Sequence, residues 1–306
     1  LIQGDDWGVT KDCSGKILLE FVSSNPTGPL HVGHGRGAVL GMAIANLLEN
    51  IGYKVTKEYY VNDAGRQVSI LTSSLLLNAY VKSFESDGTY EGDYIKELAK
   101  TFRTNFGELD KVIDFGHLDE DKDIRLDAIS NYFKSEFSDA WREAKKFAVK
   151  EILNLIKKDL HSFNIIHDHW FSESSLGAVE DNNSDLSKSL KALKNNGYTY
   201  AKDGAEWFKT TEFGDDKDRV LLRENKEPTY YLTDVGYHKN KIDRDFDSYI
   251  NIFGADHHGY IPRLSAAFNV MKKEHQSIEF LLYQLVNLYE EGVKKTMSTR
   301  RGEYFS

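Results

Sequence analysis

One stretch decides the fold of this chain: Ser23-Ser24-Asn25-Pro26-Thr27-Gly28-Pro29-Leu30-His31-Val32-Gly33-His34-Gly35-Arg36-Gly37. It places two histidines and four glycines between two apolar runs. The run before it, residues 17–22, predicts a buried strand, and the run after it, residues 38–48, predicts a helix that Asn50 and Gly52 end. A strand, a tight glycine turn and a helix start form a phosphate site, because the free N–H groups and the positive dipole end of the helix attract anions. The stretch therefore predicts a nucleotide-binding turn.

Two imidazoles lie three positions apart in this turn, at His31 and His34. Their N–H groups can donate to phosphate oxygens, on which negative charge grows when the α-phosphate is attacked, so such donors favour the transition state. The glycines let the backbone come close to a nucleotide. The alternative is that both histidines only cap the helix or pack against it, and the isolated H-x-G-H motif leaves both interpretations open.

Length and composition limit the possible classes of protein. The 306 residues predict two domains or one large domain with insertions, and 40% hydrophobic residues are ample for a core. The single cysteine, Cys13, excludes an internal disulfide and is typical of a reducing cytoplasm. No apolar run reaches the length of a membrane span, and the first residues do not resemble a signal peptide. Because the chain begins with Leu1 rather than Met, we expect it to be a piece of a longer protein.

The formal net charge is −9. A protein whose whole surface grips nucleic acid is usually basic, so this chain is expected to touch nucleic acid only through local patches. The acidic excess also suits a cationic small substrate. One local basic patch is a helix face with Lys145, Lys146, Lys150, Lys157 and Lys158, for which a plain solvated surface is the alternative.

The chain divides by pattern into a two-part α/β domain with inserted material. Strands are expected at residues 54–61, 163–171, 249–253 and 280–288. One helix is expected to begin near Asn62-Asp63, which would form its N-cap, and two others at residues 141–156 and 262–273. The boundaries follow: an irregular lead-in at 1–15, a first half at 16–80, an insertion at 81–138, a helix and strand returning to the sheet at 139–175, a second insertion with hairpins at 176–227, and a second half at 228–306.

Alternation of strands and helices implies a parallel sheet, and ligands of such sheets bind at the carboxyl ends of the strands, where the strand order reverses. The turn with His31 and His34 and a second turn at residues 254–259 both follow predicted strands. We therefore expect the two turns to face one another across one crevice.

Residues 20–37 resemble the HIGH region of class I aminoacyl-tRNA synthetases, in the form typical of bacterial arginyl-tRNA synthetases. Further stretches resemble that family in the same order: residues 59–65, 207–220, 228–238 and, as the KMSKS loop, 297–302. The resemblance implies an α/β catalytic domain with a Rossmann-like parallel sheet split by connective insertions. The family also has an extra N-terminal domain and a helical anticodon-binding domain, which these residues do not contain.

The same resemblance implies an activity. Its members make arginyl-adenylate and pyrophosphate from L-arginine and ATP with Mg²⁺, and then transfer arginine to the 3′ end of tRNA-Arg. We accordingly expect tRNA-Arg and L-arginine as partners, no protein-bound zinc, no membrane association, a monomer, and a cytoplasmic location.

Site residues follow by resemblance, position by position. Those of the arginine pocket are Glu20, Ser23, Asn25, Tyr230, Asp234 and His238, and those that contact ATP are His31 and His34 as catalytic donors with Gly33, Gly254, Asp256, His257, Met297 and Ser298. The chemistry agrees, because a guanidinium is a planar fork of donors that pairs best with carboxylates. Tyr230 and Asp234 lie one helical turn apart, although without the family Asp234 can equally be a cap or a solvated acid and Tyr230 a core aromatic.

The last loop departs from the family pattern, because Thr296 and Thr299 stand at the two lysine positions of KMSKS. Lys294, Lys295, Arg300 or Arg301 are the candidates to neutralise the β- and γ-phosphates, and a solvated basic end is the alternative. Two other functions remain open at this point. One is another nucleotidylyltransferase with an H-x-G-H motif, and the other is a non-catalytic tRNA-binding paralogue.

Overall fold

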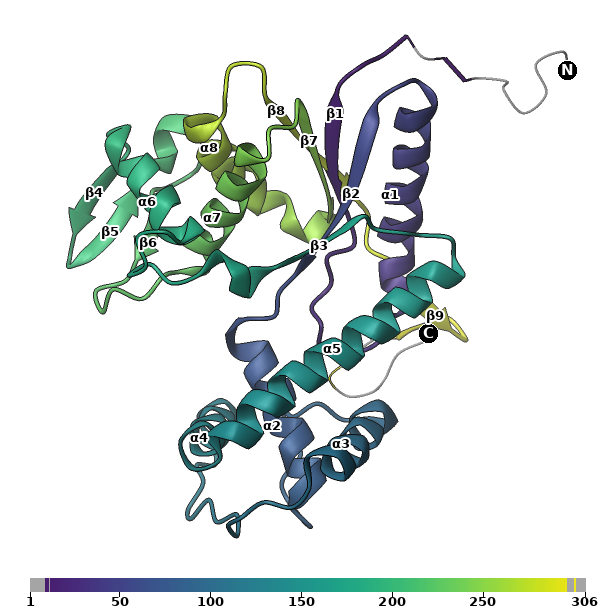
Figure 1. The fold of residues 1–306 in the computed structure, drawn as a ribbon, viewed down its shortest axis with the longest axis vertical. Coiled ribbons are helices and arrows are strands. Elements are labelled where there is room, and N and C mark those ends of the chain that lie inside the picture. The colour runs from purple at the N-terminus through teal and green to yellow at the C-terminus, as the bar shows by residue number, and fades with distance from the viewer. Residues whose placement is uncertain (1–8, 11, 296–299, 301–306) are drawn as a thin grey trace, which may run out of the picture. The chain divides into compact units, whose positions relative to one another are not determined.

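The computed structural model describes residues 9–10, 12–295 and 300, and these form two compact units (Figure 1). Among the described residues, unit 1 contains those up to 23, residues 36–61 and residues 167–285, and unit 2 contains residues 24–35, 62–166 and those from 286 on. Residues 62–80 thus belong with the inserted helices, whereas the sequence pattern placed them in the first half of the α/β domain.

Unit 1 is built on a five-stranded parallel sheet with the order β3-β2-β1-β7-β8. The strands are β1 (Lys16–Glu20), β2 (Lys54–Val61), β3 (His169–Ser172), β7 (Ser248–Gly254) and β8 (Ser277–Tyr283). The chain adds β2 and β3 on one side of β1 and later adds β7 and β8 on the other side. The strand order therefore reverses between β1 and β7, as the α/β prediction requires. In Figure 1 the long strands of this sheet run side by side.

Helix α1 (Val32–Asn50) packs closely through two glycines. A Cβ atom built on Gly41 meets the ring of Phe21 at 2.2 Å, and one built on Gly37 meets the ring of Tyr283 at 2.7 Å. Both glycines are buried one helical turn apart, so they form a groove into which the aromatic side chains fit. Close approach of α1 therefore depends on the absence of side chains at these positions.

Two further helices belong to the α/β core of unit 1: α7 (Tyr230–Asp243) and α8 (Ile261–Met271), which has Pro262 in its first turn as predicted. Helix α7 was not among the helices expected from the sequence pattern. Strand β8 ends at Tyr283, five residues before the expected end, and β3 begins at His169 rather than at residue 163. The early start was wrong because α5 continues to Ser162 and leaves Phe163 74% exposed.

The second insertion of unit 1 forms a small antiparallel sheet of β4 (Thr199–Lys202), β5 (Ala205–Phe208) and β6 (Arg219–Leu222). The turn between β4 and β5 lies at Asp203-Gly204, within residues 176–227 where hairpins were expected. Helix α6 (Asp185–Asn195) lies in the same stretch and was not expected there. In the described part of this unit, 3-10 helices also lie at Glu173–Leu176, Thr210–Phe213 and Ala255–Tyr260.

Unit 2 is mainly helical, with α2 (Gly65–Tyr80), α3 (Asp93–Phe106), α4 (Lys122–Glu136) and α5 (Ser138–Ser162), and a hairpin of β9 (Leu288–Glu290) and β10 (Val293–Lys295). Figure 1 shows α3, α4 and α5 around α2, whose residues 70–77 are all buried. Ala64 occupies the N-cap position of α2, so the expected cap at Asn62-Asp63 was wrong. Among the residues that the structure describes, none of the helices is long and apolar enough to cross a membrane.

Candidate active site

The carboxyl end of β1 carries a strained turn. Val22 and Ser23 both have positive φ angles, of 70° and 42°, in the left-handed region that a β-branched residue rarely adopts. Such a conformation costs on the order of 1–3 kcal/mol and is typical of functional sites. It places the Ser23 hydroxyl between two elements, where Oγ donates to Oε1 of Glu20 at 3.0 Å and accepts the Tyr60 N–H at 3.0 Å.

Helix α7 brings an acid to the same edge of the sheet. Burial, followed by the charges of Glu173 and Glu20, raises the pKa of Asp234 to about 7, while Arg263 and Lys241 act in the opposite direction. A carboxyl group in this state gains most from an incoming cation. Tyr230 stands one turn earlier on α7 and is 60% exposed, so it is not a core aromatic.

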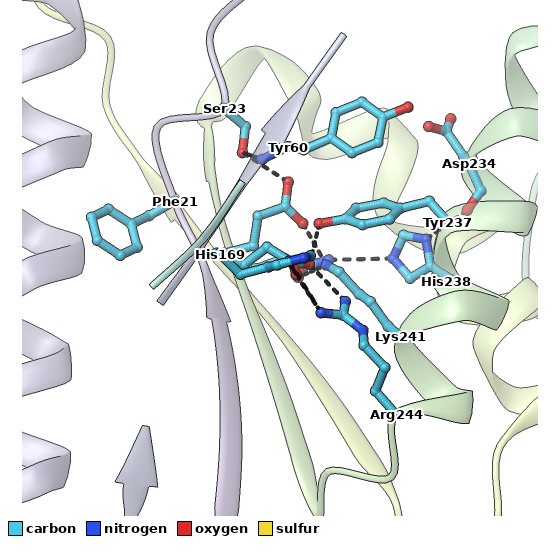
Figure 2. Close-up of polar contacts among 12 residues, drawn as sticks. Phe21, Ser23, Tyr60, His169, Asp234, Tyr237, His238, Lys241 and Arg244 are labelled. Atoms are coloured by element: carbon cyan, nitrogen blue, oxygen red, sulfur yellow. Dashed lines mark hydrogen bonds and ion pairs between the residues drawn. The ribbon is translucent and has the colours of Figure 1, made fainter. Parts of the chain in front are cut away.

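The side chain of His238 does not point to a free site, because both ring nitrogens are occupied. Nδ1 lies 2.8 Å from the Asp234 carbonyl oxygen and therefore carries the proton, and Nε2 accepts from Nδ2 of Asn251 at 3.3 Å. Burial and the charge of Lys241 lower the pKa of His238 to about 3, so the ring is neutral. His238 thus belongs to the hydrogen-bond network around Lys241 (Figure 2), and its contact with arginine stays a prediction.

Two ion pairs with buried carboxylates underlie the acid cluster. Lys241 pairs with Glu20, and Arg244 binds Glu58 through two hydrogen bonds, with N–O distances of 2.5 and 2.9 Å. Glu58 also accepts from the Tyr237 hydroxyl at 2.7 Å. Burial pushes the pKa of Glu58 up, but the bonds from Arg244 and the charge of Lys241 outweigh it and hold that pKa at about 2.

The sequence analysis missed several members of this cluster. Tyr60 donates to Oε2 of Glu173 at 2.6 Å, at the carboxyl ends of β2 and β3. Lys241 lies seven residues after Asp234, a helical spacing that was a usable signal for one shared face. Nothing local in the sequence pointed to Glu58 or Glu173.

His31 and His34 adopt a defined arrangement in unit 2. The rings stack with centroids 3.9 Å apart; Nδ1 of His31 accepts from the Gly33 N–H at 3.1 Å, and Nδ1 of His34 accepts from the His31 N–H at 3.2 Å. Both histidines therefore accept backbone N–H groups at the start of α1, and their role toward phosphate stays a prediction. Because both Nδ1 atoms accept, both Nε2 atoms carry hydrogens. Burial lowers the pKa of His31 and, with the charge of His31, lowers that of His34 to about 4, so both rings are neutral donors.

The turn after β7 is the 3-10 helix Ala255–Tyr260. A Cβ on Gly254 would meet Oδ1 of Asp256 at 2.4 Å, so the glycine leaves room for that carboxylate to fold back. Asp256 and His257 are about half-exposed, with an Asp256 Oδ2 to His257 Nε2 distance of 3.7 Å. Among residues 9–10, 12–295 and 300, no group of three or more His, Cys, Asp or Glu is arranged to hold a metal ion.

The structure thus brings together Glu20, Ser23, Asp234 and His238 in unit 1. Asn25 belongs to unit 2, where its Nδ2 donates to Oε1 of Gln67 at 2.9 Å. The expectation that the two turns face one another stays a prediction, because one turn belongs to each unit. Met297 and Ser298 lie outside the described residues.

Comparison with known proteins decides the family. The model of the tRNA synthetases class I (R), catalytic domain, matches residues 1–306. The chain belongs to this family. Among curated relatives, this synthetase domain is 44% identical over 306 residues to the arginine–tRNA ligase of Legionella pneumophila (strain Corby), covering 95% of the chain and 51% of the relative. It is 43% identical over 315 residues to that of Vesicomyosocius okutanii, with 99% and 54% covered. The chain therefore spans about half the length of the curated relatives it matches.

Solved structures agree. An arginyl-tRNA synthetase structure from Campylobacter jejuni has a TM-score of 0.79 and 33% identity, and the match covers 99% of this chain and 62% of that one. The Thermus thermophilus arginyl-tRNA synthetase is similar in fold alone, with a TM-score of 0.64, 20% identity, and 88% and 48% covered. The synthetase catalytic domain with a Rossmann-like parallel sheet is thereby confirmed, and the unrelated nucleotidylyltransferase alternative is wrong.

Proposed function

We propose that the protein is an ATP-dependent arginine–tRNA ligase, of which this chain is the catalytic domain. The observation that carries the proposal is the acid cluster at the strand-order reversal, where Glu20 and Asp234 lie on two elements of unit 1. Asp234 shares its environment with Glu173, and burial together with this neighbour keeps its carboxyl near half-protonation. Such a site gains free energy when a guanidinium supplies the missing positive charge.

The first reaction needs no protein base. The carboxylate of arginine is already ionised, and its oxygen attacks the α-phosphorus of ATP, which arrives as a magnesium complex. The new O–P bond forms as the bond to the β-phosphate bridging oxygen breaks, and pyrophosphate leaves with that electron pair. Catalysis is then positioning plus stabilisation of phosphate charge.

The two histidines suit that stabilisation. As neutral rings with hydrogens on Nε2, His31 and His34 donate to phosphate oxygens without adding a full charge. They stand at the first turn of α1, whose N–H groups also favour an anion, and Gly33 lies between the two rings in the sequence. Gly254, Asp256 and His257 are proposed to hold adenosine, with the exposed carboxylate of Asp256 accepting from a ribose hydroxyl.

In the second reaction, a terminal hydroxyl of tRNA-Arg attacks the arginyl carbonyl, and AMP leaves. The structure divides the basic face of α5: Lys146, Lys150 and Lys158 are exposed, whereas Lys145 and Lys157 are half-buried. The exposed lysines recur at multiples of four residues and so line one stripe of the helix, which favours contact with a phosphate backbone. We propose a cytoplasmic monomer as the working form.

The test is pyrophosphate exchange by the full-length protein with each amino acid in turn, with and without tRNA-Arg. Arginine together with tRNA-Arg is expected to drive exchange of labelled pyrophosphate into ATP. Exchange driven by lysine or glutamate, or none with arginine, would contradict the assignment. The absence of any exchange combined with tight tRNA binding would instead identify the non-catalytic paralogue.

A further inference from the structure

A lysine amine is already present in the acid cluster. Lys241 has a relative exposure of 0%, and its Nζ donates to Oε2 of Glu20 at 2.5 Å and to Oδ1 of Asn251 at 2.9 Å. The centroid of the Tyr237 ring lies 4.3 Å from the same nitrogen. The amine is thus held by two oxygens and an aromatic face, far from bulk water.

Burial of this pair is a poor way to stabilise a fold. Two charges lose hydration when they are buried, and apolar residues of similar volume often serve equally well or better. A site for a cationic substrate gives a reason to retain the buried Lys241–Glu20 pair. Such a site needs an ionised carboxylate where water is excluded, and a buried charge needs a paired charge.

The contacts of Glu20 leave room for a substrate. Its carboxylate has about four lone-pair positions. The Lys241 amine occupies one on Oε2 and the Ser23 hydroxyl occupies one on Oε1. Both contacts fix the orientation of the group, and the remaining positions can accept donors of a bound cation.

We propose that Lys241 is a positioning residue for arginine recognition, which keeps the Glu20 carboxylate ionised and correctly oriented for the substrate. This inference rests on the proposed function. A chain of hydrogen bonds continues from the Lys241 amine. Asn251 joins this amine to His238, and the His238 ring donates to the Asp234 carbonyl oxygen. Figure 2 shows His238 and Lys241 projecting from α7 toward the strand end.

The positive charge beside Glu20 comes from the Lys241 amine and not from the other ionisable groups around it. They lie on α7 and on β2: Asp234, Tyr237, Glu58 and Tyr60. None of these four can bring a positive charge, and Arg244 is committed to Glu58. Without Lys241, the buried Glu20 carboxyl would stand beside these other acids and lose the amine that contacts it.

The experiment compares Lys241→Met with the wild type in the full-length protein, using arginine-dependent exchange from about pH 6 to about pH 9. Buried glutamates without a cation have pKa values of about 8–9, so the KM for arginine should rise roughly 10- to 100-fold at about pH 7. It should return toward the wild-type value near the alkaline limit. The kcat at saturating arginine and the KM for ATP should change little. Lys239→Met, which removes an amine paired with Asp243 on the same helix, is the matched control and should leave the profile in place.

Folding is addressed by a second variant, the pair Glu20→Gln with Lys241→Met, which buries no charge at either position. If Lys241 acts through Glu20, this double variant should have the KM of Glu20→Gln alone, whatever the pH. The inference would be overturned if the increase in KM in the double variant were the product of the increases in the two single variants. A folded Lys241→Met protein with the wild-type pH profile would also overturn it. Wild-type exchange that does not need arginine would overturn the proposed function itself, whereas an unchanged Lys241→Met profile with normal arginine dependence overturns only the role of Lys241.

Discussion

Arginine binding should depend on pH through a single carboxyl group, that of Asp234. Burial and the charges of Glu173 and Glu20 raise its pKa to about 7 in the free protein. A guanidinium pairs with the ionised form, which is lost as the pH falls. Since about one tenth of such groups are ionised one pH unit below the pKa, affinity should fall about tenfold between about pH 8 and pH 6, or about 1.4 kcal/mol.

The measurement is calorimetric titration of the full-length protein with arginine, without ATP, in two buffers of different ionisation enthalpy. Binding near pH 7 should release about half a proton, because pairing with the guanidinium lowers the carboxyl pKa. Asp234→Asn should bind arginine weakly and without pH dependence. Asp243→Asn, at an exposed ion pair on the same helix, should retain the wild-type profile. An affinity that stays within about twofold from pH 6 to pH 8, with no proton release, would refute the reasoning.

Three other predictions follow from local geometry. Gly41→Ala should lower the thermal stability of the full-length protein, because its Cβ would lie 2.2 Å from the Phe21 ring. Overpacking costs about 1–3 kcal/mol, against a gain of about 1 kcal/mol in helix propensity. Gly35→Ala is the control and should not destabilise the protein, because a Cβ at this position would have nothing within 4 Å. His34→Ala should lower kcat about 10²–10³-fold, the scale for one transition-state donor, and an unchanged kcat in exchange assays would remove this histidine from the mechanism. The pKa of Glu58 is held at about 2, below the usual 4.5, so its contribution to stability is complete above about pH 4.5 and is lost as the pH falls toward 2. Between these pH values the free energy of unfolding of the wild type should therefore fall by about 3 kcal/mol more than that of Glu58→Gln. Equal losses of stability in acid unfolding experiments on the two proteins would contradict this.

Local pattern was sufficient for the elements that obey a clear period. The apolar run that ends at Glu20, the glycine turn and helix α1 follow one another closely, so the phosphate-binding interpretation needed no distant residue. The helix face that ends in Ile156 was equally clear, because its apolar residues recur every three or four positions. Weakly amphipathic segments such as α4 and short ones such as α6 were missed, since their helical state depends on neighbours supplied by the fold.

The sequence by itself determined the parallel α/β class, and it predicted the turn with His31 and His34 as a nucleotide site and Glu20 and Asp234 as acids at the substrate. Only the tertiary structure decided which cations stand beside the acids of the site. Glu20 meets Lys241 across 221 positions of the chain, and Glu58 meets Arg244 across 186. A carboxylate's pKa depends on burial and on charges within a few ångströms, and neither quantity exists until distant segments pack together.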